Sequence, residues 1–208
     1  MSRIGIMGGT FNPIHAGHLM LAEAAREEMQ LDEVWFIPTG CSYMKENDSG
    51  REGFPSPTER LEMTRLAVED NPDFRCLDLE VMREGFTYSY ETLEELRRKY
   101  PANSYYFILG ADCLYSIENW KAPERLFAAC EIVAAVRGDA AMEEMQSKVD
   151  ELEKKYPARI SLLPFRNLEL SSTDIRKRVA EGKSIRYMTT DPVISYIRAK
   201  GFYKNENS

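Results

Sequence analysis

The sequence predicts an α/β protein with a doubly wound, mainly parallel sheet and helices on both of its faces. Short runs of β-branched and aromatic residues alternate with segments of helical periodicity, which is typical of parallel strands joined by helices. The 208 residues and the 43% hydrophobic fraction suit one globular domain with its own core. A glycine-rich stretch also separates the first strand from the first helix, and such sheets bind ligands at the carboxyl ends of their strands.

Six strands and the helices between them are expected from the hydrophobic pattern. The expected strands are the apolar or aromatic runs Arg3–Met7, Glu33–Pro38, Phe74–Leu79, Ser104–Leu109, Glu131–Val136 and Arg159–Leu163. The expected helices have apolar residues three and four positions apart. They cover Leu19–Met29, Pro57–Val68, a segment around Leu93 and Leu96 that stops near Pro101, and Met142–Tyr156, whose apolar stripe is expected to pack on the sheet.

Two helices carry clear signals at their ends. Ser56-Pro57-Thr58-Glu59 reads as a capping box with proline at the first helical position. Asp191-Pro192 opens a last helix, and Gly201 stops it. We expect this last helix to cover the core as a structural lid. Residues 1–208 are therefore expected to form one domain, whose part from about residue 171 is helical.

The charge balance argues against a nucleic acid as the main partner. The net charge is -7 and the pI about 5.1, whereas nucleic-acid binders usually carry a basic excess. A few local cations and backbone amides can still bind a small anion on an acidic protein.

The four cysteines predict a reduced, cytoplasmic protein. Cys41, Cys76, Cys113 and Cys130 form no CxxC pair, and their spacing matches neither a disulfide framework nor a zinc site. The first residues lack the apolar segment of a signal peptide, and no run has the length that spans a bilayer. We expect no membrane partner and no metal held by protein ligands; a homo-oligomer is compatible with the sequence.

The stretch HAGH contains both histidines of the chain, His15 and His18, three residues apart. Gly8 and Gly9 stand upstream, after the first strand, where glycine lets the backbone approach a phosphate closely. Two imidazoles at the start of a helix can donate hydrogen bonds to one anionic group and stabilise charge that develops there. The alternative is that two loop histidines meet by chance.

A second candidate anion site lies at LSSTDIR, residues 170 to 176, which follows a strand and opens a helix. The hydroxyls of Ser171, Ser172 and Thr173 can bond free amides or a phosphate. Arg176 adds a rigid fork of donors one turn further on. A simply capped helix is the alternative. No GxGxxG follows the first strand, and EGKS at 181 to 184 lacks the glycine of a P-loop, so neither of those motifs explains the chain.

Together these motifs resemble the HxGH nucleotidyltransferases. GGTFNPIHAGH is similar to their GGTFDPxHxGH, with Asn12 in place of the usual acid, and LSSTDIR is similar to ISSTxIR. Over the whole chain the fuller resemblance is to bacterial nicotinate-nucleotide adenylyltransferases. It rests on Thr87–Leu93 (SYTxDTL in the family), Leu109–Asp112 followed by Trp120 (GxD…W), and Ala135–Gly138 (an arginine turn). The family's PHK triplet is replaced by Tyr43-Met44-Lys45, which keeps only the lysine.

The resemblance implies a Rossmann-like fold and a cytoplasmic enzyme of NAD biosynthesis. The family transfers the adenylyl group of ATP to nicotinate mononucleotide, with Mg²⁺ bound to ATP, and releases deamido-NAD and pyrophosphate. It implies catalytic roles for His15, His18, Lys45 and Arg176. It implies ATP contacts for Gly8, Gly9, Thr10, Phe11, Gly110, Asp112, Ser171, Ser172 and Thr173, and acceptor contacts for Tyr88, Ser89, Trp120 and Arg137. A buried ion pair is the alternative for Asp112, and a core position is the alternative for Trp120.

Other functions stay open at this point. Phosphopantetheine adenylyltransferases resemble the two ends of the chain but typically have threonine where His15 stands, and cytidylyltransferases lack the middle segments. A nucleotide sensor without catalysis leaves the retained His15, His18, Lys45 and Arg176 unexplained, and a purely structural adaptor leaves both motifs unexplained. The acceptor can be the nicotinate or the nicotinamide nucleotide.

Overall fold

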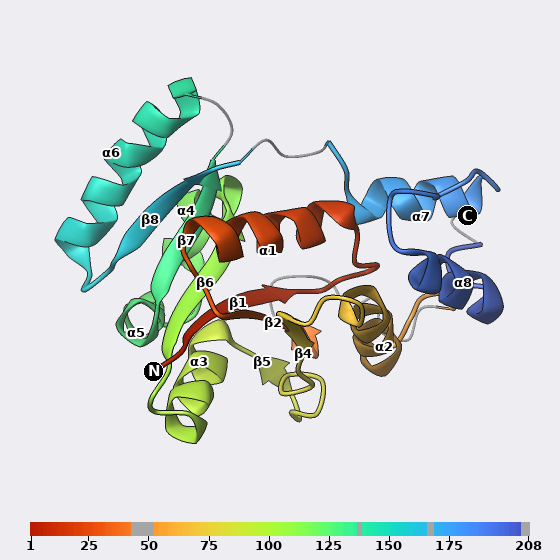
Figure 1. Ribbon diagram of the computed structural model, residues 1–208, viewed down its shortest axis with the longest axis horizontal. Coiled ribbons are helices and arrows are strands. Elements are labelled where there is room, and N and C mark those ends of the chain that lie inside the picture. The colour runs from red at the N-terminus through yellow and green to blue at the C-terminus, as the bar shows by residue number, and fades with distance from the viewer. Residues whose placement is uncertain (43–51, 137–138, 166–168, 205–208) are drawn as a thin grey trace. The chain divides into compact units, whose positions relative to one another are not determined.

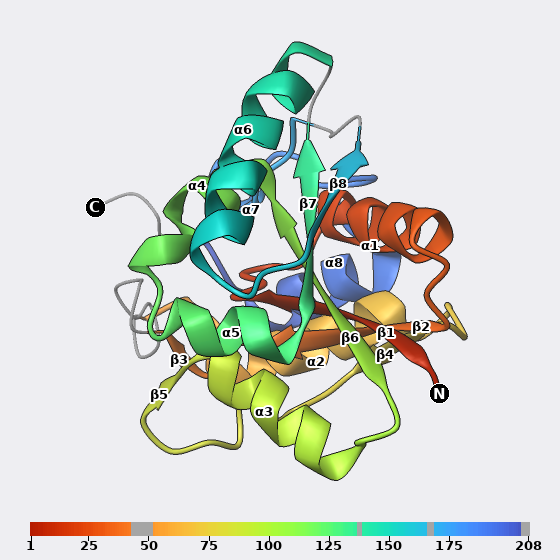
Figure 2. The ribbon, with the colours of Figure 1, turned by 90° about the vertical axis from the view of Figure 1, so that its left-hand side faces the viewer.

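The computed structural model describes residues 1–42, 52–136, 139–165 and 169–204. The strands of the main sheet are β1 (Arg3–Gly9), β2 (Glu33–Pro38), β4 (Phe74–Cys76), β6 (Ser104–Gly110), β7 (Glu131–Val136) and β8 (Ile160–Pro164). Their order is β4-β2-β1-β6-β7-β8, and the pairs β1–β6, β6–β7 and β7–β8 are parallel (Figures 1 and 2). β3 (Cys41–Ser42) and β5 (Phe86–Thr87) form a separate parallel pair.

Helices alternate with these strands and confirm the predicted α/β class. They are α1 (Ala16–Glu28), α2 (Pro57–Val68), α3 (Ser89–Lys99), α4 (Ala111–Ser116), the 3-10 turn η1 (Ile117–Asn119), α5 (Pro123–Ala129), α6 (Asp139–Lys155), α7 (Ser172–Ala180) and α8 (Asp191–Lys200). Across the described ranges, no helix combines the length and the apolar character needed to cross a membrane.

All six predicted strands are present; β2 and β7 have the predicted bounds, and the other four have shifted ends. β4 stops at Cys76 rather than Leu79, because after Leu77 donates its N–H to the carbonyl of Phe36 the chain turns away. β1 runs on through Gly9, so the glycines end the strand instead of following it. The predicted first helix starts at Ala16, three residues earlier than expected.

By its internal contacts the chain divides into two compact units. Unit 1 comprises Met1–Gly8, Leu21–Trp35 and Tyr88–Asn167, and unit 2 comprises Gly9–Met20, Phe36–Thr87 and Leu168–Ser208. Each unit brings together segments that are far apart in the sequence. The single domain expected from the chain length stays a prediction.

The core of unit 1 is formed by strands that are apolar almost throughout. β7 is buried from Ile132 to Val136, as expected for a parallel strand covered on both faces. α6 packs on β7 and β8 (Figure 1) with the predicted apolar stripe, in which Met145, Val149 and Leu152 are at most 2% exposed. The amphipathic pattern of this segment is therefore explained by packing on the sheet.

Unit 2 contains α2, α7 and α8, whose ends follow local sequence signals. The predicted capping box of α2 is present: the Ser56 hydroxyl accepts from the Glu59 N–H, and the Glu59 carboxylate accepts from the Ser56 N–H. Gly201 ends α8 in the left-handed conformation, with φ 70°. α2 and α8 pack together (Figure 1), and Lys200 pairs with Glu59 at 3.4 Å.

Gly40 follows β2 at a point where the chain leaves no room for a side chain. A Cβ there would overlap the carbonyl oxygen of Glu80 and lie 3.4 Å from Cγ2 of Thr87. We expect Gly40→Ala to lower the free energy of unfolding by about 3 kcal/mol, because a backbone carbonyl cannot move aside as a side chain can. Urea unfolding measures this change.

The matched control is Gly110→Ala. At Gly110 the φ is -80°, and a Cβ would meet no atom within 4 Å. We expect this variant to change the free energy of unfolding by less than about 0.5 kcal/mol. Equal stability of the two variants would contradict the close approach at Gly40.

Candidate active site

The connection between β1 and α1, residues Thr10 to His15, is the centre of the candidate site in unit 2; we call it the phosphate turn. Its left-handed residue is Phe11, with φ 48°, rather than a glycine. Gly9 supplies space instead: a Cβ there would lie 2.9 Å from the Phe11 ring. The Phe11 side chain is 2% exposed and contacts Phe36 and, edge-on, His18. An aromatic anchor therefore holds the turn to the core.

Four carbonyl oxygens of the phosphate turn accept hydrogen bonds from side chains far away in the sequence. The pairs are Arg60 Nη1 to Thr10 at 2.6 Å, Arg176 Nη1 to Asn12 at 2.9 Å, Ser172 Oγ to Pro13 at 2.8 Å, and Thr189 Oγ1 to Ile14 at 2.9 Å. The Ala16 N–H also donates to the Met188 carbonyl at 2.8 Å. Since a buried carbonyl without a donor is costly, these bonds fix the path of the turn.

Arg60 on α2 makes the most extensive of these contacts. Besides Thr10, its guanidinium donates to the carbonyls of Thr39 at 2.6 Å and Gly40 at 3.1 Å. The residue is only 3% exposed, and burial lowers the pKa of its guanidinium. Its planar fork suits several acceptors at once. Arg60 thus joins the chain after β1 to the chain after β2.

The two histidines lie against each other at the end of the turn. Their rings are stacked, with centroids 3.7 Å apart and planes 26° apart. The His15 N–H donates to Nδ1 of His18 at 3.3 Å, so Nδ1 of His18 is unprotonated and its proton lies on Nε2. His18 can therefore present Nε2 as a donor.

His15 is 7% exposed, and burial lowers its pKa to about 4, although the carboxylate of Asp174 acts in the opposite direction. It is neutral near pH 7. Its buried Nδ1 has no hydrogen-bond partner among the described residues. A buried polar atom without a partner at a helix start fits a site that a ligand completes.

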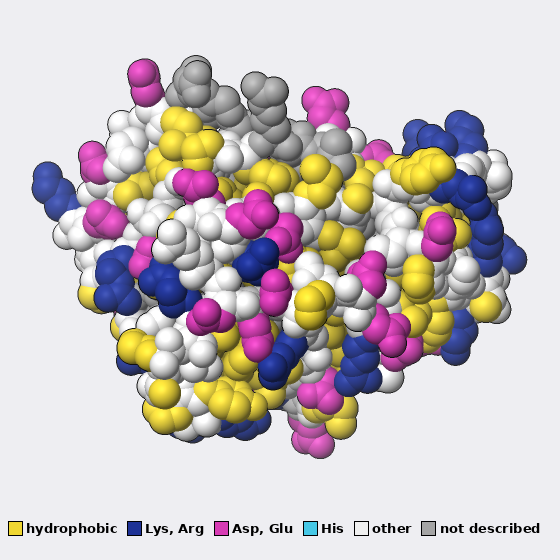
Figure 3. All heavy atoms as spheres, in the orientation of Figure 1, with side chains coloured by type: hydrophobic (Ala, Val, Ile, Leu, Met, Phe, Trp, Pro, Cys, Tyr) yellow, Lys and Arg dark blue, Asp and Glu magenta, His cyan; other side chains and the backbone are white. Residues whose placement is uncertain are grey.

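The start of α7 faces the same turn through its side chains. The Ser171 hydroxyl caps the helix by accepting from the Asp174 N–H, and it donates to the Asp174 carboxylate at 2.6 Å. Ser172 bonds the turn, and Thr173 Oγ1 accepts from Arg176 at 3.2 Å. The three predicted hydroxyls thus cap α7 (Ser171), bond the phosphate turn (Ser172) and orient Arg176 (Thr173). Figure 3 shows lysine and arginine side chains over α7 and α8, so this part of an acidic chain is locally cationic.

The structure thus brings together the predicted residues Gly9, Thr10, Phe11, His15, His18, Ser171, Ser172, Thr173 and Arg176 in unit 2. The other described candidates, Gly8, Tyr88, Ser89, Gly110, Asp112 and Trp120, belong to unit 1. Lys45 and Arg137 lie outside the described residues.

In unit 1, Gly110 ends β6 and precedes α4, and Asp112 is exposed in the first turn of α4. Tyr88 precedes α3 and stacks on Tyr90, with ring centroids 5.9 Å apart. Ser89 is the first residue of α3. The exposure of Asp112 excludes a buried ion pair for its carboxylate.

Trp120 follows η1 and packs edge-on against Phe107, with centroids 6.2 Å apart. Its indole N–H is buried and has no partner within the described part of the chain. η1 is tied to α6 because Glu118 pairs with Lys148 at 2.7 Å and Lys155 at 2.6 Å. The segment that carries Trp120 is therefore held by ionic contacts.

Sequence reasoning missed Arg60, Thr189 and Tyr203, and noted Asn12 only as a replacement. The Tyr203 hydroxyl donates to Oδ1 of Asn12 at 2.7 Å. One available signal was Arg60 itself, which stands on the apolar face of α2 four residues before Thr64 and next to Leu61. A cationic side chain on a helix face that is predicted to be buried indicates that it has hydrogen-bond acceptors in the core.

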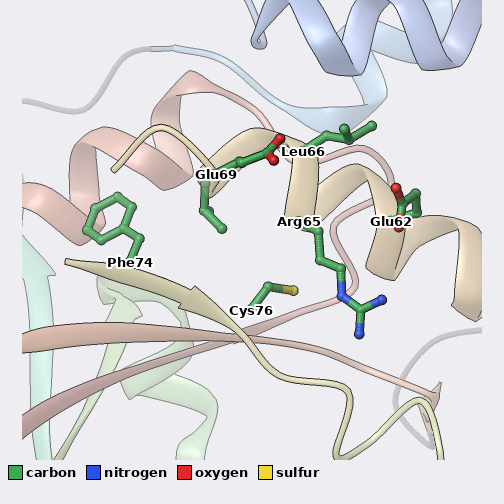
Figure 4. Close-up of a pocket in the computed structure, with 7 residues that line it drawn as sticks. Glu62, Arg65, Leu66, Glu69, Phe74 and Cys76 are labelled. Atoms are coloured by element: carbon green, nitrogen blue, oxygen red, sulfur yellow. The ribbon is translucent and has the colours of Figure 1, made fainter. Parts of the chain in front are cut away.

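A pocket beside α2 and β4 is separate from the candidate active site (Figure 4). It measures about 390 Å³ and is lined by Glu62, Arg65, Leu66, Val68, Glu69, Phe74 and Cys76, none of which is a predicted site residue. Two carboxylates disfavour a polyphosphate there. Burial raises the pKa of the Cys76 thiol to about 12, so it does not supply a thiolate nucleophile near neutral pH.

Comparisons with known proteins match this chain over nearly its whole length. The family model Cytidylyltransferase-like matches residues 6–178. A probable nicotinate-nucleotide adenylyltransferase of Lachnoclostridium phytofermentans is 45% identical over 98% of this chain and 100% of the relative. One of Exiguobacterium sibiricum is 39% identical over 97% and 98%.

Solved structures share the fold at lower identity. Plasmodium falciparum nicotinic acid mononucleotide adenylyltransferase complexed with NaAD has a TM-score of 0.75 at 22% identity, with 98% of both chains covered. The same Plasmodium falciparum protein complexed with APC has a TM-score of 0.74 at 21% identity, again over 98% of both chains.

The lowered pKa of His15 makes the stability of the protein depend on pH. In the unfolded chain His15 binds a proton below about pH 6.5, whereas in the folded chain it does so only near pH 4. Acidification between these values therefore stabilises the unfolded state. We expect the wild type to lose about 2 kcal/mol more than His15→Asn between pH 7.5 and pH 5. Urea unfolding at both pH values measures this, and parallel pH curves for the two proteins would refute it.

Proposed function

Because the chain belongs to the nicotinate-nucleotide adenylyltransferases, within the Cytidylyltransferase-like family, we propose that it transfers the adenylyl group of ATP to nicotinate mononucleotide. A phosphate oxygen of the acceptor attacks the α-phosphorus of ATP. The bond from that phosphorus to the α,β-bridging oxygen breaks, and pyrophosphate leaves with the electron pair. The products are nicotinate adenine dinucleotide (deamido-NAD) and pyrophosphate. The reaction serves NAD biosynthesis, and we assign it to the cytoplasm.

One observation carries this proposal: two stacked imidazoles at the start of α1, on a turn that four distant side chains hold in place. The acceptor phosphate is already a nucleophile, so the protein needs no activated serine or cysteine. Burial raises the pKa values of two of the four cysteines, Cys76 and Cys130, to about 12, so neither of these two supplies a thiolate near neutral pH. Catalysis then rests on alignment and on stabilising charge at phosphorus.

The donors of unit 2 are assigned to the triphosphate. His18 Nε2–H contacts the reacting phosphate, and His15, whose Nδ1 has no hydrogen-bond partner among the described residues, completes the same anion contact. Arg176 and the start of α7 hold the pyrophosphate that leaves. Gly8, Gly9, Thr10 and Phe11 shape the ATP contact, together with Ser171, Ser172 and Thr173, and Lys45 is a further phosphate ligand.

The remaining assignments concern the ribose of ATP and the acceptor nucleotide. Gly110 and Asp112, at the end of β6 and the start of α4, suit a ribose because an exposed carboxylate accepts from hydroxyls. Trp120 stacks on the pyridine ring. Tyr88 and Ser89 bond the nicotinate carboxylate, and Arg137 neutralises the acceptor phosphate.

We propose that ATP enters as its magnesium complex. Among the described residues there is no group of three or more His, Cys, Asp or Glu side chains that could hold a metal ion. The donors around the phosphate turn are imidazoles, hydroxyls and the guanidinium groups of Arg60 and Arg176, and such donors suit phosphate oxygens. Magnesium keeps most of its water and binds through substrate phosphates in such sites. The ion thus belongs with the substrate and lowers the charge of the triphosphate.

His18→Ala tests the catalytic assignment. Removing one donor to charge that develops in the transition state should lower kcat by about 10²- to 10³-fold. We expect the free energy of unfolding to change by less than about 1 kcal/mol, because His18 is half-buried. Pyrophosphate release and urea unfolding measure the two effects. The control is Met20→Ala, an exposed position two residues further along α1. An unchanged kcat in folded His18→Ala would remove His18 from the reaction.

A choice of acceptors tests the substrate. We expect purified protein with ATP and Mg²⁺ to release pyrophosphate at least 10-fold faster with nicotinate mononucleotide than with nicotinamide mononucleotide, because a site built for a carboxylate leaves polar groups unpaired with the amide. Phosphopantetheine should give no release. Fastest release with another acceptor would keep the chemistry and change the substrate. Bound ATP without release from any acceptor would favour a sensor.

A further inference from the structure

Tyr203 lies in the short segment after α8 and reaches the phosphate turn from the C-terminal end of the described chain. Its side chain is fully buried, and its backbone is left-handed, with φ 63°. The hydroxyl donates to Oδ1 of Asn12 at 2.7 Å, across 191 positions of sequence. The N–H of Tyr203 donates to the carbonyl of Gly53 at 2.8 Å. The bond to Gly53 holds the backbone of Tyr203, and the bond to Asn12 holds the hydroxyl end of its ring.

Four residues, Asn12, Tyr203, Phe54 and Arg176, form a closed cycle of contacts. Tyr203 bonds the Asn12 amide oxygen, and Arg176 bonds the Asn12 carbonyl at 2.9 Å. The guanidinium of Arg176 lies 6.0 Å from the centroid of the Phe54 ring. Phe54 in turn packs edge-on against Tyr203, with centroids 5.6 Å apart. Each of the four residues is therefore in contact with two of the others.

We propose that Tyr203 is a positioning residue for adenylyl transfer, acting through Asn12 on the phosphate turn and on Arg176. This inference rests on the proposed function. The phenol oxygen and the Asn12 side chain are both withdrawn from water, and Asn12 is 6% exposed. If the buried Asn12 amide oxygen loses the Tyr203 hydroxyl, it must find another donor, and the turn moves with it. Displacement of donors that act on the leaving pyrophosphate lowers the rate of the chemical step.

Tyr203→Phe removes the hydroxyl and keeps the ring that packs on Phe54. We expect kcat to fall about 10-fold while the KM values for ATP and nicotinate mononucleotide stay within about threefold, because the loss concerns the transition state. The matched control is Tyr196→Phe. Tyr196 lies on α8, where its ring contacts Phe202 and Lys200; Phe202 packs against Tyr203, so this control shares the packing around Tyr203 but lies outside the hydrogen bond to Asn12. This control should keep the wild-type kcat.

A double-mutant cycle separates positioning from general stability. Asn12→Leu removes the acceptor at similar volume, and we expect its combination with Tyr203→Phe to lower kcat no further than Asn12→Leu alone. Near-UV circular dichroism gives the folded fraction at the assay temperature, and kcat is expressed per folded molecule, so a less stable variant still reports on the chemistry.

The outcomes distinguish this inference from the proposed function. Absence of pyrophosphate release from the wild type with nicotinate mononucleotide would overturn both. An active wild type with unchanged kcat in Tyr203→Phe would overturn the role of Tyr203 alone. Equal losses in Tyr203→Phe and Tyr196→Phe, or losses that multiply in the double variant, would also overturn it.

Discussion

The site of unit 2 depends on one requirement, which is that the buried carbonyl groups of the phosphate turn must find hydrogen-bond donors. The turn has no regular structure of its own, so no helix or strand partner supplies them. Arg60, Ser172, Arg176 and Thr189 do so from elements spread over the chain. Each donor ties one carbonyl to a side chain outside the turn, and together the four bonds restrict the path of the turn. The position of the two histidines follows from that path.

The same burial that requires donors also sets the charge of the site. His15 is deep enough to stay neutral near pH 7, and His18 accepts from the main chain and so keeps its proton on Nε2. Permanent positive charge comes instead from guanidinium groups. Arg60 places a positive charge at the Thr10 carbonyl, and Arg176 places one at the Asn12 carbonyl. Donors of fixed charge state suit a reaction in which negative charge moves between phosphate oxygens, because they need no rearrangement of protons.

The sequence predicted those parts of the molecule that local chemistry determines. Apolar runs located all six strands of the main sheet, and the capping box at Ser56 and the stop at Gly201 located two helix ends. The two motifs that form the unit 2 site, HAGH and LSSTDIR, were both recognised in the sequence. β3 and β5 were not predicted, because two-residue strands exist only through their pairing with each other.

The missed residues have a common physical reason. Thr189 and Tyr203 act on groups 175 and 191 positions away, and Arg60 acts on one 50 positions away. A hydroxyl or guanidinium that meets a distant carbonyl leaves no periodicity or spacing in the sequence. Asn12 was noticed as a departure from the family motif, but its use as an acceptor for a C-terminal tyrosine became visible only in three dimensions.

The long separation of these partners has a consequence for the order in which the protein matures. Synthesis proceeds from the N-terminus, and N-terminal parts of a chain can fold before the rest is made. Here the turn at residues 10 to 15 is translated well before three of its side-chain partners, Ser172, Arg176 and Thr189. Tyr203, which holds the Asn12 side chain, comes later still. A nascent chain therefore carries both histidines before the residues that hold them in place have been made, and the site is assembled only after Tyr203 has been translated.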